Sequence, residues 1–352
     1  MPARYVQPLP RFSQAWRALA AAVIMLAACV KGGETAKVED NTPRKRITVA
    51  IQPFTAHAPL LLAHAAGFFA QEGLDVEFIK VANSTEAIPS LLNGDLDVFP
   101  GSANPGLLNA MARGVPVRMV ADRGYLDPSG CTSAAIMVPP GRAAAIRANP
   151  RLVRRISVER QHGVLYLIEK SLESVGLSLD SLDTKIVPPL PEAEALGKGT
   201  LDAAFVGEPW IARAISAGKA EIWLRVEEVL PHLQSGFIFY GPSLLTQDPD
   251  AGRRFLIAYR RGVAKLLEGK TPENVQIMVS ETGDTPDLVR QSCWPTFRAD
   301  GRIDLASTQE YQRWLQQKGL VPELATPDQM WDPSFLAYAD SVLKQRGSES
   351  RQ

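Results

Sequence analysis

The chain has 352 residues, 45% apolar and 22% charged, which is an ordinary composition for a globular protein long enough to form two domains. Basic and acidic residues number 38 each, so the chain lacks the basic field of a nucleic-acid-binding protein. Residues 1–28 hold three of the arginines and no acid, which leaves 35 basic and 38 acidic residues in the rest.

The N-terminal segment has the pattern of an export signal. Arg4, Arg11 and Arg17 precede an apolar core at 18–28, which is too short to span a bilayer but is typical of a signal peptide. Leu26-Ala27-Ala28-Cys29 matches the bacterial lipobox, which predicts a lipid on Cys29; the alternative is an ordinary signal peptide with an incidental cysteine. The polar residues 29–45 then form a flexible tether. No later run of eighteen apolar residues predicts a membrane span.

Strands and helices alternate after this tether. Repeated strand–helix units predict a mostly parallel sheet covered by helices. Pro89 is expected to kink or shorten the helix that contains it. The expected elements are strands at 46–51, 75–81, 96–99 and 115–121 and helices at 58–72, 85–92 and 105–113.

A second stretch repeats this pattern. Its expected elements are strands at 155–159, 185–187 and 201–207 and helices at 163–175, 191–198 and 211–218. G-D-L-D-V-F-P-G at 94–101 is echoed by G-T-L-D-A-A-F-V-G at 199–207, and each follows a short helix. We therefore predict two similarly built α/β lobes.

The C-terminal region is expected to be helical. A strand at 236–241 leads into amphipathic helices near 249–268, 272–282, 307–317 and 333–345. These helices are interpreted as packing on the outer faces of the sheets.

No motif predicts catalysis or metal binding. HExxH, CxxC, GxSxG, P-loop and strand-associated GxGxxG patterns are all absent from the sequence. His57 and His64 would lie about 10 Å apart along one helix, too far apart for one metal. Cys131 and Cys293 could pair in an exported protein or stand as separate thiols, and the sequence leaves both open.

The informative residues lie in turns that follow strands, because ligands of open α/β sheets bind at the carboxyl ends of strands. Several have structural alternatives: Ser84 and Asn104 as helix N-caps, Phe54 and Trp210 as core, and Glu208, His57 and His162 as solvated residues. Gly101 to Asn104 is a small-residue turn before a helix, where a ligand could approach the backbone. The candidate ligand contacts are Phe54, Thr55, His57, Ser84, Ser102, Asn104, Tyr125, His162, Glu208 and Trp210.

Three stretches resemble a known family. HAPLLLAHAAGFFAQEGLDVEF at 57–78, LLNGDLDVFPGSAN at 91–104 and GTLDAAFVGEPW at 199–210 are similar to the signatures of bacterial ABC-transporter substrate-binding proteins of the nitrate/sulfonate/taurine and thiamin-pyrimidine-precursor group. LIEKSLESVGLSLDSL at 167–182 resembles the helix of that family's second lobe. The resemblance extends over about residues 46–340.

The resemblance implies an α/β, two-lobed type II periplasmic-binding-protein fold in which each lobe is a mostly parallel sheet flanked by helices. The implied domains are a signal peptide at 1–28, a lipidated tether at 29–45, lobe I at 46–135 and 235–345, an inserted lobe II at 136–234, and a disordered tail at 346–352. The ligand would lie between lobes that close by a hinge. The family's first-lobe contacts fall on Phe54, Thr55, His57, Ser84, Ser102 and Asn104, and its second-lobe loops on 160–163, Glu208 and Trp210.

The resemblance also implies the function. A lipid-anchored, monomeric protein at the extracytoplasmic face of a bacterial membrane, in the periplasm, would capture a small organic solute and deliver it to an ABC permease and its ATPase, without catalysis, cofactor or metal. A sensory or scaffold lipoprotein is the alternative. The family's pyrimidine-synthase branch carries a cysteine-rich motif that is missing here, which makes an enzyme the less favoured alternative.

Two solute classes are compatible with these residues. A small oxyanion such as a sulfonate would use helix N-termini and hydroxyls, helped by Arg123 or Arg160. An amino-heterocycle would stack on Phe54, Tyr125 or Trp210 and donate to Glu208. Because an ionised Glu208 would repel an anion, an amino-bearing or neutral ligand is slightly favoured.

Overall fold

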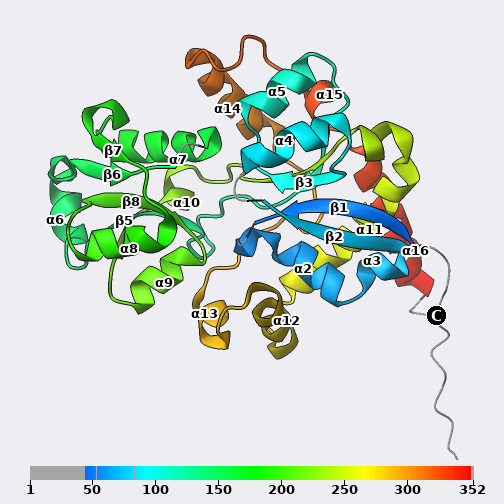
Figure 1. Ribbon diagram of the computed structural model, residues 1–352, viewed down its shortest axis with the longest axis horizontal. Coiled ribbons are helices and arrows are strands. Elements are labelled where there is room, and N and C mark those ends of the chain that lie inside the picture. The colour runs from blue at the N-terminus through cyan, green and yellow to red at the C-terminus, as the bar shows by residue number, and fades with distance from the viewer. Residues whose placement is uncertain (1–43, 53, 82–83, 160, 350–352) are drawn as a thin grey trace, which may run out of the picture. The chain divides into compact units, whose positions relative to one another are not determined.

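Two five-stranded sheets organise the chain (Figure 1). The computed structural model describes residues 44–52, 54–81, 84–159 and 161–349, and for residues 84, 85, 189 and 190 it describes the backbone alone. The signal peptide, Cys29 and nearly all of the predicted tether lie outside the described residues. Pro43–Gln352 forms one unit.

The first sheet has the strand order β2–β1–β3–β10–β4. β1 pairs in parallel with β2 and β3, whereas β10 lies antiparallel between β3 and β4. The sheet is therefore mostly parallel, with one reversed strand supplied from later in the chain. Its strands are Lys45–Ile51 (β1), Leu74–Lys80 (β2), Val98–Gly101 (β3), Arg118–Asp122 (β4) and Phe237–Tyr240 (β10).

The second sheet has the order β7–β6–β8–β5–β9. β6 is parallel to β7 and β8, and β5 lies antiparallel between β8 and β9. The two orders correspond strand for strand, and the echoed segments supply the two central strands, β3 and β8. The predicted pair of similarly built sheets is thus confirmed. The strands are Ala134–Val138 (β5), Arg155–Ser157 (β6), Asp183–Lys185 (β7), Ala203–Gly207 (β8) and Glu221–Arg225 (β9).

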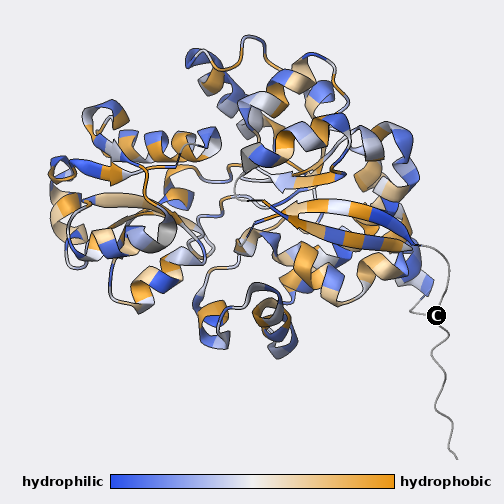
Figure 2. Cartoon of the chain, in the orientation of Figure 1, coloured by the Kyte–Doolittle hydropathy of each residue, from blue (hydrophilic) through white to orange (hydrophobic). Residues whose placement is uncertain are grey.

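Helices cover both sheets. Figure 2 shows most helices alternating between hydrophobic and hydrophilic colours, as expected for elements with one buried face. Those that precede β10 are Ala58–Ala65 (α2), Phe68–Gln71 (α3), Ser84–Asn93 (α4), Pro105–Ala112 (α5), Ala143–Ala148 (α6), His162–Glu173 (α7), Pro189–Gly197 (α8), Trp210–Ser216 (α9) and Val226–Val229 (α10). Those that follow it are Pro249–Leu267 (α11), Pro272–Thr282 (α12), Pro286–Gln291 (α13), Leu305–Gln317 (α14), Pro327–Met330 (α15) and Ser334–Glu349 (α16).

Single turns supplement these helices. The 3-10 turns are Thr55–His57 (η2), Pro150–Leu152 (η3) and Leu179–Ser181 (η4), and Ser243–Gln247 (η5) is a π-helical turn.

Three apolar clusters hold these layers together. One packs β1 and β10 against α2 and α11, where a Cβ on Gly262 would lie 2.1 Å from the Pro59 carbonyl oxygen. Glycine is therefore required for these two helices to approach so closely. A smaller cluster packs β5 and β8 against α8 and α9. The third is continuous between the two sheets and includes Tyr166, Tyr311 and Trp314.

Several sequence predictions differ from the structure. Pro89 does not shorten its helix, which continues from Ser84 to Asn93, and β5 and β9 have no counterpart among the expected strands. The helix expected at 58–72 is two helices, because Gly67 adopts a left-handed conformation with φ of 70°. The tail expected to be disordered from residue 346 is helical to Glu349, and the Arg346 side chain is anchored by Glu72 (Nη2–Oε2, 3.1 Å). Lys45 belongs to β1 rather than to the tether, and the boundary expected between residues 135 and 136 falls inside β5.

Two crossing segments join the sheets. Residues 123–133 lead from β4 to β5, and residues 226–236 lead back from β9 to β10. The segments bond to each other, with Leu126 N–H donating to Leu233 O (2.9 Å) and His232 N–H to Leu126 O (2.7 Å). Cys131 forms a disulfide with Cys293, which settles the question that the sequence leaves open.

No helix within the described ranges is long and apolar enough to cross a membrane.

Candidate functional site

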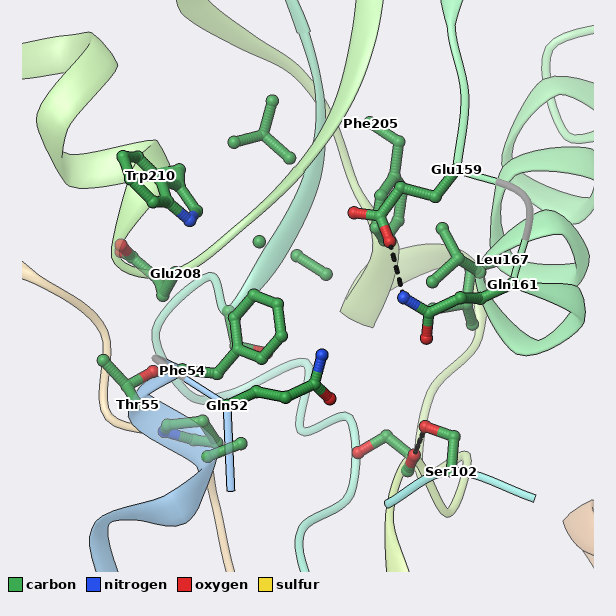
Figure 3. Close-up of a pocket in the computed structure, with 18 of the residues that line it drawn as sticks. Gln52, Phe54, Thr55, Ser102, Glu159, Gln161, Leu167, Phe205, Glu208 and Trp210 are labelled. Atoms are coloured by element: carbon green, nitrogen blue, oxygen red, sulfur yellow. Dashed lines mark hydrogen bonds between the residues drawn. The ribbon is translucent and has the colours of Figure 1, made fainter. Parts of the chain in front are cut away.

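The ends of several strands from both sheets meet around one cavity of about 190 Å³. Phe54 and Thr55 follow β1, Ser102 follows β3, and Glu208 and Trp210 follow β8. These five predicted residues line the cavity together (Figure 3). They converge because each turn begins where a strand of its sheet ends, which is the usual ligand position in open α/β sheets.

The small turn after β3 has a structural reason as well. Gly101 lines the cavity, but a Cβ on it would lie 2.1 Å from the ring of Phe99. The ring fills the space where a side chain would be, so the packing of Phe99 alone requires glycine here. Ser102 lies beside it and donates its hydroxyl to Ser235 O (2.8 Å), which links the turn to the returning crossing segment.

His57 does not line the cavity. It is 1% exposed, and its Nε2 lies 3.3 Å from Nη2 of Arg123, which does line the cavity. Because a guanidinium only donates, Nε2 is the acceptor and Nδ1 carries the proton. Burial, and then the charge of Arg123, lower the pKa of His57 well below its usual value, so the ring is neutral. His57 positions Arg123 instead of facing a ligand.

Arg123 occupies a tight site made possible by Gly236. A Cβ on Gly236 would lie 2.7 Å from Nη1 of Arg123. Burial lowers the pKa of Arg123 to about 10, and the neighbouring Tyr259 and Asp122 raise it, so the side chain stays charged at neutral pH. Asp122, the preceding residue, lies close to the guanidinium and accepts N–H bonds from Gly124 (2.8 Å) and Arg298 (2.7 Å).

Three other predicted contacts lie away from the cavity lining. Asn104 caps α5, and its side chain accepts from Leu107 N–H (3.1 Å). The Tyr125 ring packs under the Arg298 guanidinium, 4.1 Å from the ring centre. His162 begins α7. The Ser84 side chain and Arg160 lie outside the described residues.

Glu208 lines the cavity, and its carboxylate accepts hydrogen bonds from two backbone N–H groups. Oε1 accepts from Cys293 N–H (2.8 Å) and Oε2 from Ala212 N–H (3.2 Å). Burial raises the pKa of Glu208 to about 7, although these two N–H groups and the charge of Lys270 lower it. This carboxylate therefore joins the start of α9 to the segment that carries the disulfide.

Two further glutamates, which the sequence reasoning missed, line the cavity from the second sheet. Glu159 follows β6 and accepts from the Gln161 amide (Oε2–Nε2, 3.2 Å), and Figure 3 shows its carboxylate pointing into the cavity. Glu192 lies on α8 and is 5% exposed. Burial raises the pKa of both residues, to about 8 for Glu192, where the Ser157 hydroxyl lowers it and the neighbouring Glu159 raises it further.

Only one of these two could have been found from the sequence. Glu159 ends the predicted strand 155–159, so the rule that selected Glu208 also applies to it. Glu192 lies in the first turn of a helix, where an acidic residue is ordinarily a favourable partner of the helix dipole. No local pattern distinguishes it from such a residue.

Helices from the two sheets touch on both sides of the cavity. On one side, Glu169 of α7 accepts from Trp314 Nε1 (3.1 Å) and pairs with Lys318 (2.8 Å). On the other, Ser216 at the end of α9 donates to Gln291 of α13 (2.7 Å), and Arg213 pairs with Asp284. The cavity thus lies between two sets of contacts that join the parts of the chain built on the two sheets.

The site chemistry is that of polar recognition. The described residues present hydroxyls, amides, two aromatic rings after strand ends, one guanidinium and three carboxyl groups to the cavity. Within the part of the chain that the structure describes, no group of three or more His, Cys, Asp or Glu side chains could hold a metal ion.

Comparison with known proteins is consistent with this geometry. Residues 54–134 match the NMT1/THI5-like family model, which confirms the predicted resemblance for this segment. A ligand-binding component of an ABC-type import system from Staphylococcus aureus, solved with zinc bound, superposes with a TM-score of 0.68 at 18% identity, over 84% of this chain and 99% of that one. The fold is that of ABC-import substrate-binding proteins.

Two more solved structures share the fold. A putative sulfonate ABC transporter's periplasmic sulfonate-binding protein from Methylobacillus flagellatus gives a TM-score of 0.63 at 18% identity, covering 86% of this chain and 96% of that one. A desulfurization enzyme, DSZB, gives 0.63 at 17% identity, covering 85% and 99%. No curated protein matches the sequence. The fold therefore hosts binding proteins and at least one enzyme, and the site must decide between them.

Proposed function

We propose that this protein is an extracytoplasmic solute-binding protein that captures a small organic solute between two lobes and delivers it to an ABC import permease and its ATPase. The observation that carries the proposal is the cavity of about 190 Å³ built from strand ends of both sheets. With the boundary moved to the start of β5, lobe I would comprise 45–133 and 235–349, and lobe II 134–234. Closure would occur about the paired crossing segments at Leu126 and Leu233.

Tethering completes the proposal. A lipid on Cys29 would hold the protein at the extracytoplasmic face of a bacterial membrane, close to its permease. The supporting features are the lipobox at 26–29 and the apolar core that precedes it. The protein would act as a monomer.

A ligand screen tests the binding role. We expect at least one compound from a panel of sulfonates, nitrate, bicarbonate, pyrimidines, thiamin precursors and small amines to raise the melting temperature of the full chain in mild detergent, because a ligand stabilises the state that binds it. For any such compound, Trp210→Ala should weaken binding at least about tenfold, since the half-exposed indole lines the cavity. Isothermal titration calorimetry measures this loss.

Trp331→Ala is the matched control for this variant. Trp331 is also half-buried, but it packs beside Met119 and not in the cavity lining. It should lower stability without changing affinity. A panel in which no compound binds would contradict the proposed function, and equal affinities in both variants would remove Trp210 from the site.

Cys29→Ser tests the anchor. The wild-type chain should fractionate with membranes and gain the mass of a lipid, whereas the variant should appear in the soluble periplasmic fraction, because acyl chains contribute about 0.8 kcal/mol per buried methylene. Fractionation followed by mass spectrometry measures this difference. Identical fractionation of the two proteins would favour the ordinary signal peptide.

An enzyme is the second candidate, because DSZB shares the fold. The cavity lining found in the described part of the chain includes neither a histidine nor a cysteine, and His57 faces Arg123 instead. Of the lining hydroxyls, Ser133 donates to Glu227 (2.8 Å) and Ser102 to Ser235. These bonds fix the walls of a binding site. Recovery of each screened ligand unchanged after incubation separates binding from catalysis.

A sensory or scaffold lipoprotein would bind solute without supporting uptake by a permease.

A further inference from the structure

The chemical class of the solute can be inferred from the second-sheet wall of the cavity, and this inference rests on the proposed function. Glu159 and Glu192 face the same cavity from different elements, the end of β6 and the first turn of α8. Burying one carboxylate without a counter-charge is unfavourable, and burying two beside each other is more so. Such an arrangement is stable only when something offsets the charge.

The described residues do not supply that offset. None of their ion pairs involves Glu159, Glu192 or Glu208. Glu208 differs from the other two because two backbone N–H groups satisfy it. Glu159 accepts from the neutral Gln161 amide, and the groups that shift the pKa of Glu192, besides its burial, are the neutral Ser157 hydroxyl and Glu159. Among the described residues, the unmatched charge is therefore concentrated on the Glu159–Glu192 pair.

Arg123, the cation among the described lining residues, does not offset the charge of Glu159 and Glu192. Arg123 approaches from the first sheet, and its neighbours there are His57, which is neutral, and Asp122, whose charge raises the pKa of Arg123. Asp122 therefore acts on the guanidinium electrostatically, although the two form no ion pair among the described residues. An anionic solute placed in the cavity would meet this one described cation and the two carboxyl groups of Glu159 and Glu192.

We propose that the solute is an organic nitrogen cation, an ammonium or amidinium type, whose charged group binds between Glu159 and Glu192. Such a group donates charge-assisted hydrogen bonds to both carboxylates and offsets their repulsion. The indole of Trp210 and the ring of Phe54, which also line the cavity, provide apolar and cation–π contacts for the rest of such a molecule.

The proposal predicts the direction in which the association constant of the solute changes with pH. At neutral pH Glu192 holds a proton, since burial and the charge of Glu159 raise its pKa to about 8. A bound cation favours the doubly ionised pair and expels that proton, so its association constant should rise with pH, by up to about tenfold per unit for one proton. Glu208 and Asp122 titrate in the same direction, while Arg123 and neutral His57 keep their charge states between about pH 6 and about pH 8.5. An anion would show the opposite slope.

The experiment uses the full chain in mild detergent and probes whose own charge is fixed over this range. Methylguanidinium and acetamidinium, which both carry N–H donors, are the cations, and methanesulfonate and nitrate the anions, titrated calorimetrically from about pH 6 to about pH 8.5. We expect a cation to bind with an association constant that rises with pH. Glu192→Gln should weaken it about 10- to 100-fold and flatten the slope, because it removes a charge-assisted bond. Glu159→Gln should act similarly.

Glu194→Gln is the matched control. Glu194 lies two residues away on the same helix, is exposed, and pairs with Lys219 at 3.5 Å, so the variant has the same net-charge change outside the cavity. Its cation affinity and pH slope should equal those of wild type. Absence of cation binding, cation binding that Glu192→Gln does not change, or anion binding that weakens as pH rises would each overturn the inference. Binding of anions or neutral heterocycles would still leave the proposed binding function in place, whereas failure of every class would contradict both.

Discussion

Replacing Cys131 and Cys293 together by serine is expected to lower the free energy of unfolding by about 3–5 kcal/mol. The disulfide joins residues separated by 162 positions, so its loss restores a large amount of conformational freedom to the unfolded chain. It also links the segment that leaves β4 to the segment before α14, at the point where the sheets are joined. Equilibrium denaturation in guanidinium chloride measures the change, with the midpoint and the slope fitted separately.

Reduction provides the control for this prediction. A reducing agent should destabilise the wild-type chain by a similar amount and leave the double-serine variant unchanged. Solute affinity should fall as well, because Cys293 N–H donates to Glu208 and Pro295 lines the cavity. A change in unfolding free energy below about 1 kcal/mol would show that the folded structure holds these segments together without the disulfide.

The second large effect is expected in the pH dependence of stability. Glu192→Gln should be about as stable as wild type near pH 4.5 and more stable by about 2–5 kcal/mol near pH 8.5, since one pKa unit corresponds to about 1.4 kcal/mol. The ordinary pKa of a glutamate is 4.5, and in the folded chain burial raises that of Glu192 to about 8. Between these values the folded state binds more protons than the unfolded state, so wild-type stability falls as pH rises and levels off above about 8.

Glutamine removes this slope because it does not titrate. Denaturation midpoints measured at several pH values in the absence of solute follow the difference, and Glu194→Gln, on the exposed side of α8, should keep the wild-type slope. Parallel curves for wild type and Glu192→Gln would mean that water or a chain cation already stabilises the Glu192 carboxylate. The pH dependence of the unfolding free energy shows how much the carboxyl pair destabilises the folded chain. The pH dependence of the association constant shows how much the pair contributes to binding.

The fold alone does not select the solute. By their descriptions, the proteins that share it include a zinc-bound import component and a sulfonate-binding protein, all at 18% identity or less. In open α/β sheets the ligand position at strand ends follows from the topology. The turns after strands tolerate substitution, so one fold can present different side chains to its ligand. In this chain those side chains are dominated by carboxyl groups on one wall.

The sequence by itself determined most elements of the first sheet and the repetition of its pattern, but not β5 and β9 of the second sheet. Alternating apolar runs predicted nearly every strand and helix of the first sheet, and the echo of 94–101 in 199–207 identified the two central strands. Turn residues after β1, β3 and β8 placed Phe54, Ser102 and Trp210 at the cavity, since the position of a strand end is a local property. The helix break at Gly67, which the sequence did not predict, shows the limit of periodicity, because a left-handed glycine interrupts a helix without interrupting its apolar pattern.

Only the tertiary structure decided which residues face each other. His57 follows β1 just as Phe54 and Thr55 do, yet packing turns it behind Arg123. Glu192 is an ordinary first-turn glutamate in sequence and becomes a buried cavity residue because α8 packs beside Glu159. The pairing of Cys131 with Cys293 likewise requires two segments 162 residues apart to meet. Local pattern fixes where a strand or helix begins and ends, whereas burial and charge pairing depend on contacts between distant segments.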